Sequence, residues 1–235
     1  MTTGGVSAIL PAWNEADRIG VTVAATLSLP SVTEVIVVDD GSTDATAHAA
    51  RVAGAVVVRL EHNRGKARAM EAGADRASGA FLLFLDADLG DTAGEARVLL
   101  PPVVEGRVEM TIATFPVIPG RGGGSGIVVR VSRAGIARLT GHTVRAPLSG
   151  QRCITRAAFA AARPLAHGFG VETALTIDVL RAGGRILEID TAMDHRVGQN
   201  DWRARRHRAR QLRDVLLALA PRRFGKARVC GTTET

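Results

Sequence analysis

Tyrosine is absent from the 235-residue sequence, and aromatic residues make up only 3% of it. Single-stranded nucleic acids are bound largely by stacking on aromatic side chains, so we expect no nucleic-acid partner. No run of eighteen apolar residues occurs, which argues against a membrane-spanning helix. Two cysteines, Cys153 and Cys230, are too few for a disulfide framework or a tetrahedral cage of cysteine ligands. The first five residues lack the charged and apolar regions of a secretory signal, and we expect a cytoplasmic protein.

Apolar residues (46%) are numerous enough to fill a core, and charged residues (23%) are too few for a mainly disordered chain. The charge is distributed unevenly along the chain. Residues 196–235 contain eleven Lys or Arg and three acidic residues, a net charge of +8, whereas the rest of the chain sums to −1. A basic segment of this kind indicates an anionic partner, such as a phosphate group or a lipid surface.

Short apolar segments alternate with segments of helical periodicity in the first ninety residues. We expect strands there at 6–10, 34–38, 55–59 and 81–85, and helices at 15–28, from Ser42 or Thr43, and at 66–77. This alternation predicts an α/β fold with a mostly parallel sheet covered on both faces. After Asp88 the pattern loosens, with helices expected at 93–105, 128–140, 155–162, 171–182 and 202–219 and strands at 108–114 and 185–189. No repeat or linker divides the chain, so we expect one domain over residues 1–235.

Polar residues follow three of the expected strands directly. They are the segments 11–15, Asp39-Asp40 and Asp86-Ala87-Asp88. Ligands of open parallel sheets bind at the carboxyl ends of the strands. Carboxylates gathered at such an edge repel one another unless a cation or a donor-rich ligand lies between them, so we expect a binding site there.

The segment Asp86-Ala87-Asp88 carries the clearest chemical signal. A buried strand delivers two carboxylates that flank a small residue, and Mg²⁺ or Mn²⁺ is held in proteins by one or two carboxylates together with substrate phosphates. The alternative is a capped turn, since aspartate favours turns. We expect Mn²⁺ or Mg²⁺ as cofactor.

Asp39 and Asp40 allow two interpretations. They can form a turn and cap the next helix, or accept hydrogen bonds from the N–H of a base and the hydroxyls of a ribose. Lys66 follows the third strand and either offsets phosphate charge or is simply solvated. The glycines of the dinucleotide-binding and P-loop motifs are absent.

The motifs VSAILPAWNEADRI, VIVVDDGSTDAT and NRGKARAMEAGADRASGAFLLFLDADL, in this order, resemble the nucleotide-binding half of family 2-type glycosyltransferases with the GT-A fold. The later motifs GRGGGSGIVVRVSRAGI, PLSGQRCITRAAF, GFGVETALTIDVLRAGG and MDHR resemble glucosyl-3-phosphoglycerate synthases. The resemblance implies a nucleotide-sugar-binding half over 6–90, an acceptor half over 91–197, and a basic C-terminal helix and tail over 198–235.

The resemblance also implies roles for individual residues. The nucleotide-sugar pocket would consist of Pro11, Ala12, Asn14, Glu15, Asp39, Asp40, Lys66, Asp86 and Ala87. The metal ligands would be Asp86, Asp88 and His195, and the catalytic residues Glu172 and Asp88. The acceptor-binding residues would be Gly123, Gly124, Ser125, Arg130 and Arg196. The synthases follow these glycines with an arginine and a threonine, whereas this chain continues with Ser125-Gly126-Ile127; Arg121, Arg130 and Arg133 lie nearby in the sequence.

The expected reaction is a metal-dependent transfer of a hexose, expected to be glucose, from a UDP-linked donor to a small anionic acceptor such as a phosphorylated acid. Glu172 has two alternative roles: general base for the acceptor hydroxyl in an inverting enzyme, or positioning of the sugar in a retaining one. The resemblance favours retention. The sequence leaves a homodimer open.

Three other functions compete with this one. A polyprenyl phosphate could be the acceptor, as in relatives of dolichyl-phosphate mannosyltransferase, because the 202–219 helix combines arginines with apolar residues and could lie on an anionic membrane. The favoured alternative for this helix is packing on the domain with its arginines solvated. A haloacid-dehalogenase phosphatase also has a DxD after a strand, but near its N-terminus. A sugar nucleotidyltransferase would need a glycine-rich signature near the first strand, which is missing.

Overall fold

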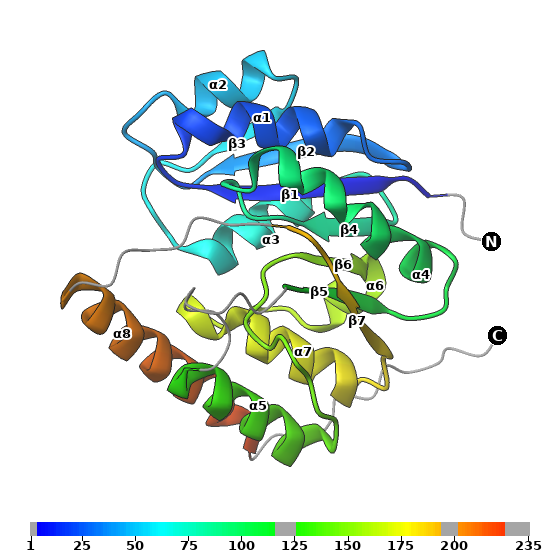
Figure 1. Ribbon diagram of the computed structural model, residues 1–235, viewed down its shortest axis with the longest axis vertical. Helices are drawn as coiled ribbons and strands as arrows, with labels where there is room; N and C mark the ends of the chain where they lie inside the picture. Colours follow the sequence, from blue (N-terminus) through cyan, green and yellow to red (C-terminus); the bar gives the residue numbers. More distant parts are fainter. Residues whose placement is uncertain (1–3, 116–125, 194–201, 224–235) are drawn as a thin grey trace.

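A computed structural model describes residues 4–115, 126–193 and 202–223, and within the last range the side chains of 209–222. It contains a seven-stranded sheet with the strand order β3-β2-β1-β4-β6-β5-β7 (Figure 1). The strands are β1 (Val6–Ala12), β2 (Val32–Asp39), β3 (Val56–Arg59), β4 (Phe81–Phe84), β5 (Met110–Thr114), β6 (Arg152–Thr155) and β7 (Ile186–Asp190). Of the pairings in this sheet, those of β6 with β4 and β5 are antiparallel and the others are parallel.

Helices cover both faces of the sheet. They are α1 (Ala16–Leu27), α2 (Thr46–Val52), α3 (Lys66–Arg76), α4 (Leu100–Val104), α5 (Ile127–Thr140), α6 (Arg156–Ala161), α7 (Val171–Arg181) and α8 (Trp202–Leu219), with 3₁₀ segments η1 (Gly90–Leu99), η2 (Gly168–Gly170) and η3 (Pro221–Arg223). Helices α5 and α8 lie beneath α7, further from the sheet, and form an extra layer (Figure 1).

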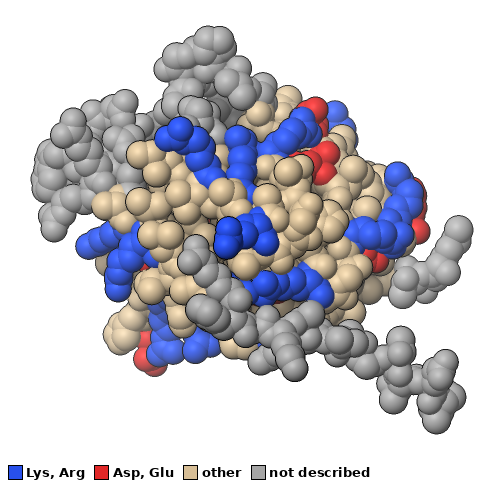
Figure 2. Space-filling view, turned by 90° about the horizontal axis from the view of Figure 1, so that it is seen from below, with Lys and Arg blue, Asp and Glu red and all other residues tan. Residues whose placement is uncertain are grey.

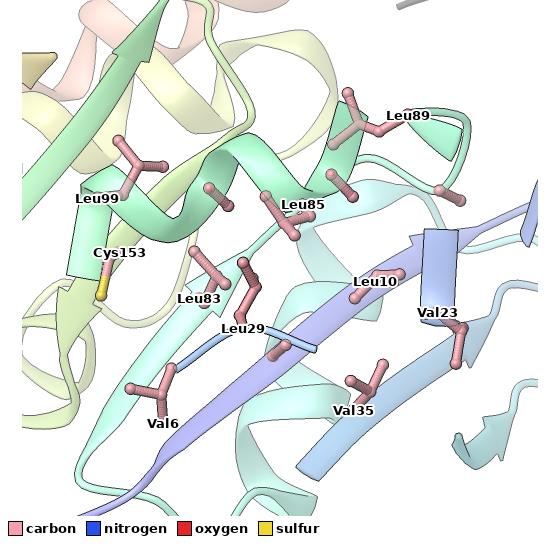
Figure 3. Close-up of a cluster of buried hydrophobic side chains, with 14 of the residues drawn as sticks. Val6, Leu10, Val23, Leu29, Val35, Leu83, Leu85, Leu89, Leu99 and Cys153 are labelled. Carbon is pink, nitrogen blue, oxygen red and sulfur yellow. The ribbon is translucent and has the colours of Figure 1, made fainter. Parts of the chain in front are cut away.

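Each face of the sheet has its own hydrophobic core. Neighbouring residues of a strand point to opposite faces, so Leu10 packs with Val23, Leu83 and Leu89 on one face (Figure 3), while Ile9 packs on the other. Burying each such side chain contributes about 1.5–3 kcal/mol. A third cluster, which includes Ile136, Ile177, Val215 and Leu219, joins α5, α7 and α8. These cores fix the strand ends against which the site is built.

The structure confirms the expected α/β fold and differs from the expectations in three places. The strand β6 was not predicted, because four residues that begin with an arginine give no clear strand pattern; only the helix that follows it was. The expected helix at 93–105 is a 3₁₀ segment followed by the short α4, whose first turn contains Pro101 and Pro102. Helix α2 begins at Thr46 rather than at Ser42 or Thr43, because the preceding polar residues fasten a loop.

Within the described residues, no helix has the length and apolarity needed to cross a membrane.

Candidate functional site

The polar segments singled out in the sequence meet at one edge of the sheet. Strand β1 pairs in parallel with both β2 and β4, so the chain leaves all three strands at the same edge. Ala12 pairs with Asp39, and Ile9 pairs with Phe84, two residues before Asp86. The aspartates after β2 and β4 therefore lie on either side of the end of β1, as the strand-end argument predicts.

The loop after β1 is fastened to the loop after β2. Asn14 adopts a left-handed conformation (φ 55°), which asparagine tolerates better than most residues. Its backbone N–H donates to Ser42 Oγ at 2.9 Å, and its side-chain Oδ1 accepts from the backbone N–H of Thr43 at 2.9 Å. Glu15 donates its backbone N–H to Thr46 Oγ1 at 2.8 Å. Asn14 thus shapes the predicted donor pocket by holding its wall.

Asp39 and Asp40 are both buried and have different partners. The two oxygens of Asp40 accept the backbone N–H groups of Arg64 and Gly65 at 2.7 and 2.8 Å, which fixes the turn into α3. Asp39 Oδ1 accepts from the backbone N–H of Ser42, and its Oδ2 lies 3.5 Å from Arg59 Nε. Within the described residues, Asp39 Oδ2 has no hydrogen-bond donor, so this atom can accept one from a ligand.

Lys66 links two carboxylates that are far apart in the sequence. Its Nζ lies 2.7 Å from Asp86 Oδ1 and 3.0 Å from Glu172 Oε1. The Lys66 and Asp86 side chains are about one-third exposed, and that of Glu172 is 9% exposed. Burial lowers the pKa of Lys66, but the charges of Asp86 and Glu172 outweigh it and raise the pKa above its usual value. The first turn of α3, the end of β4 and the first turn of α7 therefore converge on one charged group.

The segment just before β6 completes this wall of the site. Gln151 Nε2 donates to Asp86 Oδ2 at 2.6 Å. With Lys66 Nζ on Oδ1, each carboxylate oxygen of Asp86 accepts a hydrogen bond. A side chain at Gly150 would clash with Lys66 Nζ and place its Cβ 2.8 Å from Asp86 Oδ1. Neither residue was singled out from the sequence, because only the motif PLSGQRCITRAAF was recognised. A glycine and an amide immediately before an arginine in this motif were the available signal.

The oxygen atoms at the end of β4 are suitable ligands for a hard divalent cation. Asp86 and Asp88 supply carboxylate oxygens, and the turn that carries them is fixed by α1: Thr22 Oγ1 donates to the carbonyl of Ala87 at 2.8 Å, and Arg18 Nη1 donates to that of Asp88 at 2.9 Å. Across the described ranges, no group of three or more His, Cys, Asp or Glu is arranged to hold a metal. Two carboxylates plus the phosphates of a substrate nevertheless make a complete set for Mg²⁺ or Mn²⁺.

Several predicted site residues have no described position. His195, Arg196, Gly123, Gly124 and Ser125 lie outside the described residues, so the predicted third metal ligand and most of the predicted acceptor site stay predictions. Arg130 is described: it is exposed, in the first turn of α5. Pro11 and Ala12 end β1, and Ala87 is buried between the two aspartates.

A cavity of about 440 Å³ lies away from these carboxylates. It is lined by residues of the turn between α7 and β7 and of the loop after α5, among them His142, Gly183 and Glu188. It is next to the amino-terminal half of β7, whereas the candidate site follows the carboxyl ends of the parallel strands. Glu188 already accepts the backbone N–H groups of Arg145 and Ala146. We therefore place the site at the carboxylates and not at this cavity.

Comparison with known proteins gives one family. The model of the family described as "Glycosyl transferase family 2" matches residues 7–159. The chain is similar to glycosyltransferase AglJ of Haloferax volcanii, with 30% identity over 198 residues, 81% of this chain and 63% of that protein. It is also similar to dodecaprenyl-phosphate galacturonate synthase of Rhizobium johnstonii, with 39% identity over 94 residues, 36% of this chain and 28% of that protein. The chain thus spans less than two thirds of the length of these relatives.

A solved structure resembles nearly the whole chain. Glucosyl-3-phosphoglycerate synthase from Mycobacterium tuberculosis, crystallised with Mn²⁺, UDP and glucosyl-3-phosphoglycerate, matches with a TM-score of 0.80 and 26% identity, over 98% of this chain and 82% of that chain. A further structure of that enzyme contains Mg²⁺ and UDP. The fold and the resemblance expected from the sequence motifs are confirmed.

Proposed function

Because the chain belongs to glycosyl transferase family 2, we propose that it transfers a hexosyl group, with glucose the expected sugar, from a UDP-linked donor to a small anionic acceptor such as a phosphorylated acid. The ion pairs that Lys66 makes with Asp86 and Glu172 carry this proposal, because they bring a phosphate-binding cation, a metal-binding carboxylate and a further carboxylate to one edge of the sheet. The family match argues against the phosphatase and nucleotidyltransferase alternatives.

The donor nucleotide fits the groups along this edge. Asp39 Oδ2 accepts the N–H of the base, and the loops held by Asn14 and Asp40 form the walls of the nucleoside pocket. Lys66 turns from the carboxylates to the diphosphate. Asp86 and Asp88 hold Mn²⁺ or Mg²⁺, which neutralises charge on the departing diphosphate. Gln151 keeps the carboxylate of Asp86 oriented for that task.

Glu172 faces the sugar in this proposal. Its carboxylate is at the start of α7, almost buried, and close to Lys66. There it accepts hydrogen bonds from hydroxyl groups of the hexose and fixes the direction from which the acceptor approaches. Transfer then proceeds with retention, and the product keeps the α configuration of the donor. NMR of the product decides this, because a β-anomer would assign the general-base role to Glu172 instead.

A matched pair of buried glutamates tests the site. Glu71 is as buried as Glu172 but is held by Arg68 and the backbone N–H of Leu165, away from the sheet edge. We expect Glu172→Gln to lower turnover of UDP-glucose by about 100-fold, because the sugar is no longer held in its reactive position, and to leave UDP affinity nearly unchanged. Glu71→Gln should keep turnover per folded molecule. Products are followed by mass spectrometry with candidate phosphorylated acids, and unchanged turnover in Glu172→Gln would remove this residue from the site.

A lipid-linked phosphate is the second candidate acceptor, and one surface favours it. On α8, Leu216 and Leu217 are exposed at 48% and 57%, and Arg210 and Arg213 are exposed beside them in the sequence. The view onto this side of the molecule shows many more basic than acidic side chains (Figure 2). Arginines that flank exposed apolar residues suit an anionic membrane surface. The Rhizobium johnstonii relative bears the name of a dodecaprenyl-phosphate enzyme.

Vesicle binding distinguishes the two acceptors. The wild-type protein should sediment with vesicles that contain phosphatidylglycerol at low salt, and Arg213→Glu should weaken this binding several-fold. Arg51→Glu makes the same charge change on α2, which lies beyond the opposite face of the sheet (Figure 1), and should have little effect. Absence of sedimentation at low salt would eliminate the lipid acceptor and leave the small anion.

A further inference from the structure

A charged side chain that the proposed reaction does not use is buried beneath the site. Arg152 begins β6 and has no exposed surface. Among the described residues, no carboxylate forms an ion pair with it. Burial lowers the pKa of its guanidinium to about 10. Burying a charge without a partner is costly, so an arginine at this position calls for an explanation beyond filling space.

The guanidinium of Arg152 instead joins two separate segments of the main chain. On one side, Nε donates to the carbonyl of Ser149 at 2.7 Å and Nη2 to that of Pro147 at 3.2 Å. On the other side, Nη1 donates to the carbonyl of Glu172 and to Thr176 Oγ1, both at 2.9 Å. The planar fork of arginine can span both segments at once, and the single amine of lysine cannot.

Both segments carry residues of the candidate site. The 147–149 segment leads directly to Gly150, which leaves room for Lys66, and to Gln151, which holds Asp86. The other segment is the first turn of α7, whose Glu172 meets Lys66 from the opposite side. The hydrogen bonds of Arg152 therefore fix the distance between the 147–151 segment, which holds Asp86, and the first turn of α7, which carries Glu172.

We propose that Arg152 is a positioning residue that holds Glu172 in register with Asp86. The part that concerns the sugar rests on the proposed function, because Glu172 is there the residue that faces the hexose. The hydrogen bonds of Arg152 go to Pro147, Ser149, Glu172 and Thr176, so it acts on Asp86 and Lys66 through the main chain on either side. Loss of its fork should loosen both segments without removing any group that binds the nucleotide.

The chain offers a matched control in Arg156. This arginine also donates to three backbone carbonyls, those of Gly79, Ala74 and Ala77, at 2.7, 3.2 and 2.8 Å. These carbonyls belong to the last turn of α3 and to the turn that leads into β4, at the end of the sheet opposite the site. Replacing either arginine by lysine removes the same kind of interaction, and only one of them supports Glu172.

Amide hydrogen exchange of the ligand-free protein tests the positioning itself. In Arg152→Lys, we expect exchange in peptides that cover 147–151 and 170–176 to accelerate about tenfold, because the bonds that closed these segments are lost. In Arg156→Lys, only the 74–80 segment should exchange faster. Unchanged exchange in 170–176 of Arg152→Lys would overturn the proposal.

Ligand binding then separates positioning from general weakening of the fold. With Mn²⁺ present, calorimetry measures how much more tightly UDP-glucose binds than UDP. This ratio should fall about fivefold in Arg152→Lys, since Glu172 no longer meets the sugar at its proper place, and stay unchanged in Arg156→Lys. If Arg152→Lys has the same ratio of UDP-glucose to UDP affinity as the wild type, the positioning role is contradicted. If the wild type binds neither ligand, the proposed function fails, and hydrogen exchange alone decides the role of Arg152.

A second pair of variants keeps the test valid if Arg152→Lys does not fold. Thr176 accepts from Arg152 and donates to the carbonyl of Glu172, whereas the buried hydroxyl of Thr173 in the same helix has no hydrogen-bond partner in the described residues. Thr176→Val should accelerate exchange in 170–176 in the same direction as Arg152→Lys, and Thr173→Val should not. Equal exchange in both valine variants would count against the proposal.

Discussion

At the scale of single residues, the site depends on charge balance around Lys66. One ammonium group satisfies both Asp86 and Glu172, and these carboxylates would repel each other without it. The same ammonium is the group best placed to meet a diphosphate. In the proposed function, Lys66 therefore exchanges these carboxylates for the diphosphate when the donor binds.

Replacing Lys66 should weaken nucleotide binding and spare metal binding. We expect Lys66→Met to lower UDP affinity in the presence of Mn²⁺ about tenfold or more, because hydrogen bonds to charged groups contribute about 1.5–3 kcal/mol. Binding of Mn²⁺ alone should not weaken, because the lysine competes for Asp86. Calorimetry with each ligand measures both. Arg68→Met, two residues along α3 and paired with Glu71, is the control, and equal UDP affinities in the two variants would contradict this role of Lys66.

At Gly150, an added methyl group would meet two residues of the site at once. Its Cβ would collide with Lys66 Nζ and crowd Asp86, so we expect Gly150→Ala to weaken binding of UDP with Mn²⁺ about tenfold while the protein stays folded. At Gly94, a Cβ would meet nothing within 4 Å, so Gly94→Ala serves as the control in the same calorimetric assay. UDP affinity in Gly150→Ala equal to that in Gly94→Ala would show that the contact is not needed.

At the scale of elements, alternating apolar patterns were enough to predict most strands and helices, since a residue that points into a core must be apolar wherever it lies in the chain. The strand-end rule also placed Asp39, Asp40, Asp86 and Asp88 together. The roles of Gln151 and Arg152 were not predictable in this way. Their partners come from β4 and α7, and contacts between distant segments leave no local pattern in a sequence.

Helix α8 packs on the domain, which is the favoured alternative from its sequence. Val215, Ala218 and Leu219 are buried against α5 and η2, while Arg210 and Arg213 are exposed. We expect Leu219→Ala to lower the free energy of unfolding by about 2–4 kcal/mol, as for other buried leucines. Leu217→Ala, in the same turn and 57% exposed, should change it by no more than about 0.5 kcal/mol. Urea denaturation measures both, and equal effects would mean that α8 is not part of the core.

At the scale of the whole molecule, charged side chains are distributed unevenly. Acidic side chains that carry the proposed chemistry gather at one edge of the sheet, where Lys66 neutralises them in part. The face seen from below carries many more basic than acidic side chains (Figure 2). Helices α5 and α8 both contact α7, whose first turn carries Glu172, and α8 also contacts η2 just before it, so the outer layer is joined to the site through α7 and η2.

The dependence of nucleotide-sugar binding on metal tests the central claim most directly. With Mn²⁺ and UDP-glucose at about 100 times its dissociation constant, the melting temperature of the wild type should rise by about 5 °C or more. Omitting Mn²⁺ or introducing Asp86→Asn should abolish most of this rise, and Asp75→Asn, on the exposed side of α3, should preserve it. An equal rise without Mn²⁺, or in Asp86→Asn, would contradict a metal-dependent donor site at the end of β4.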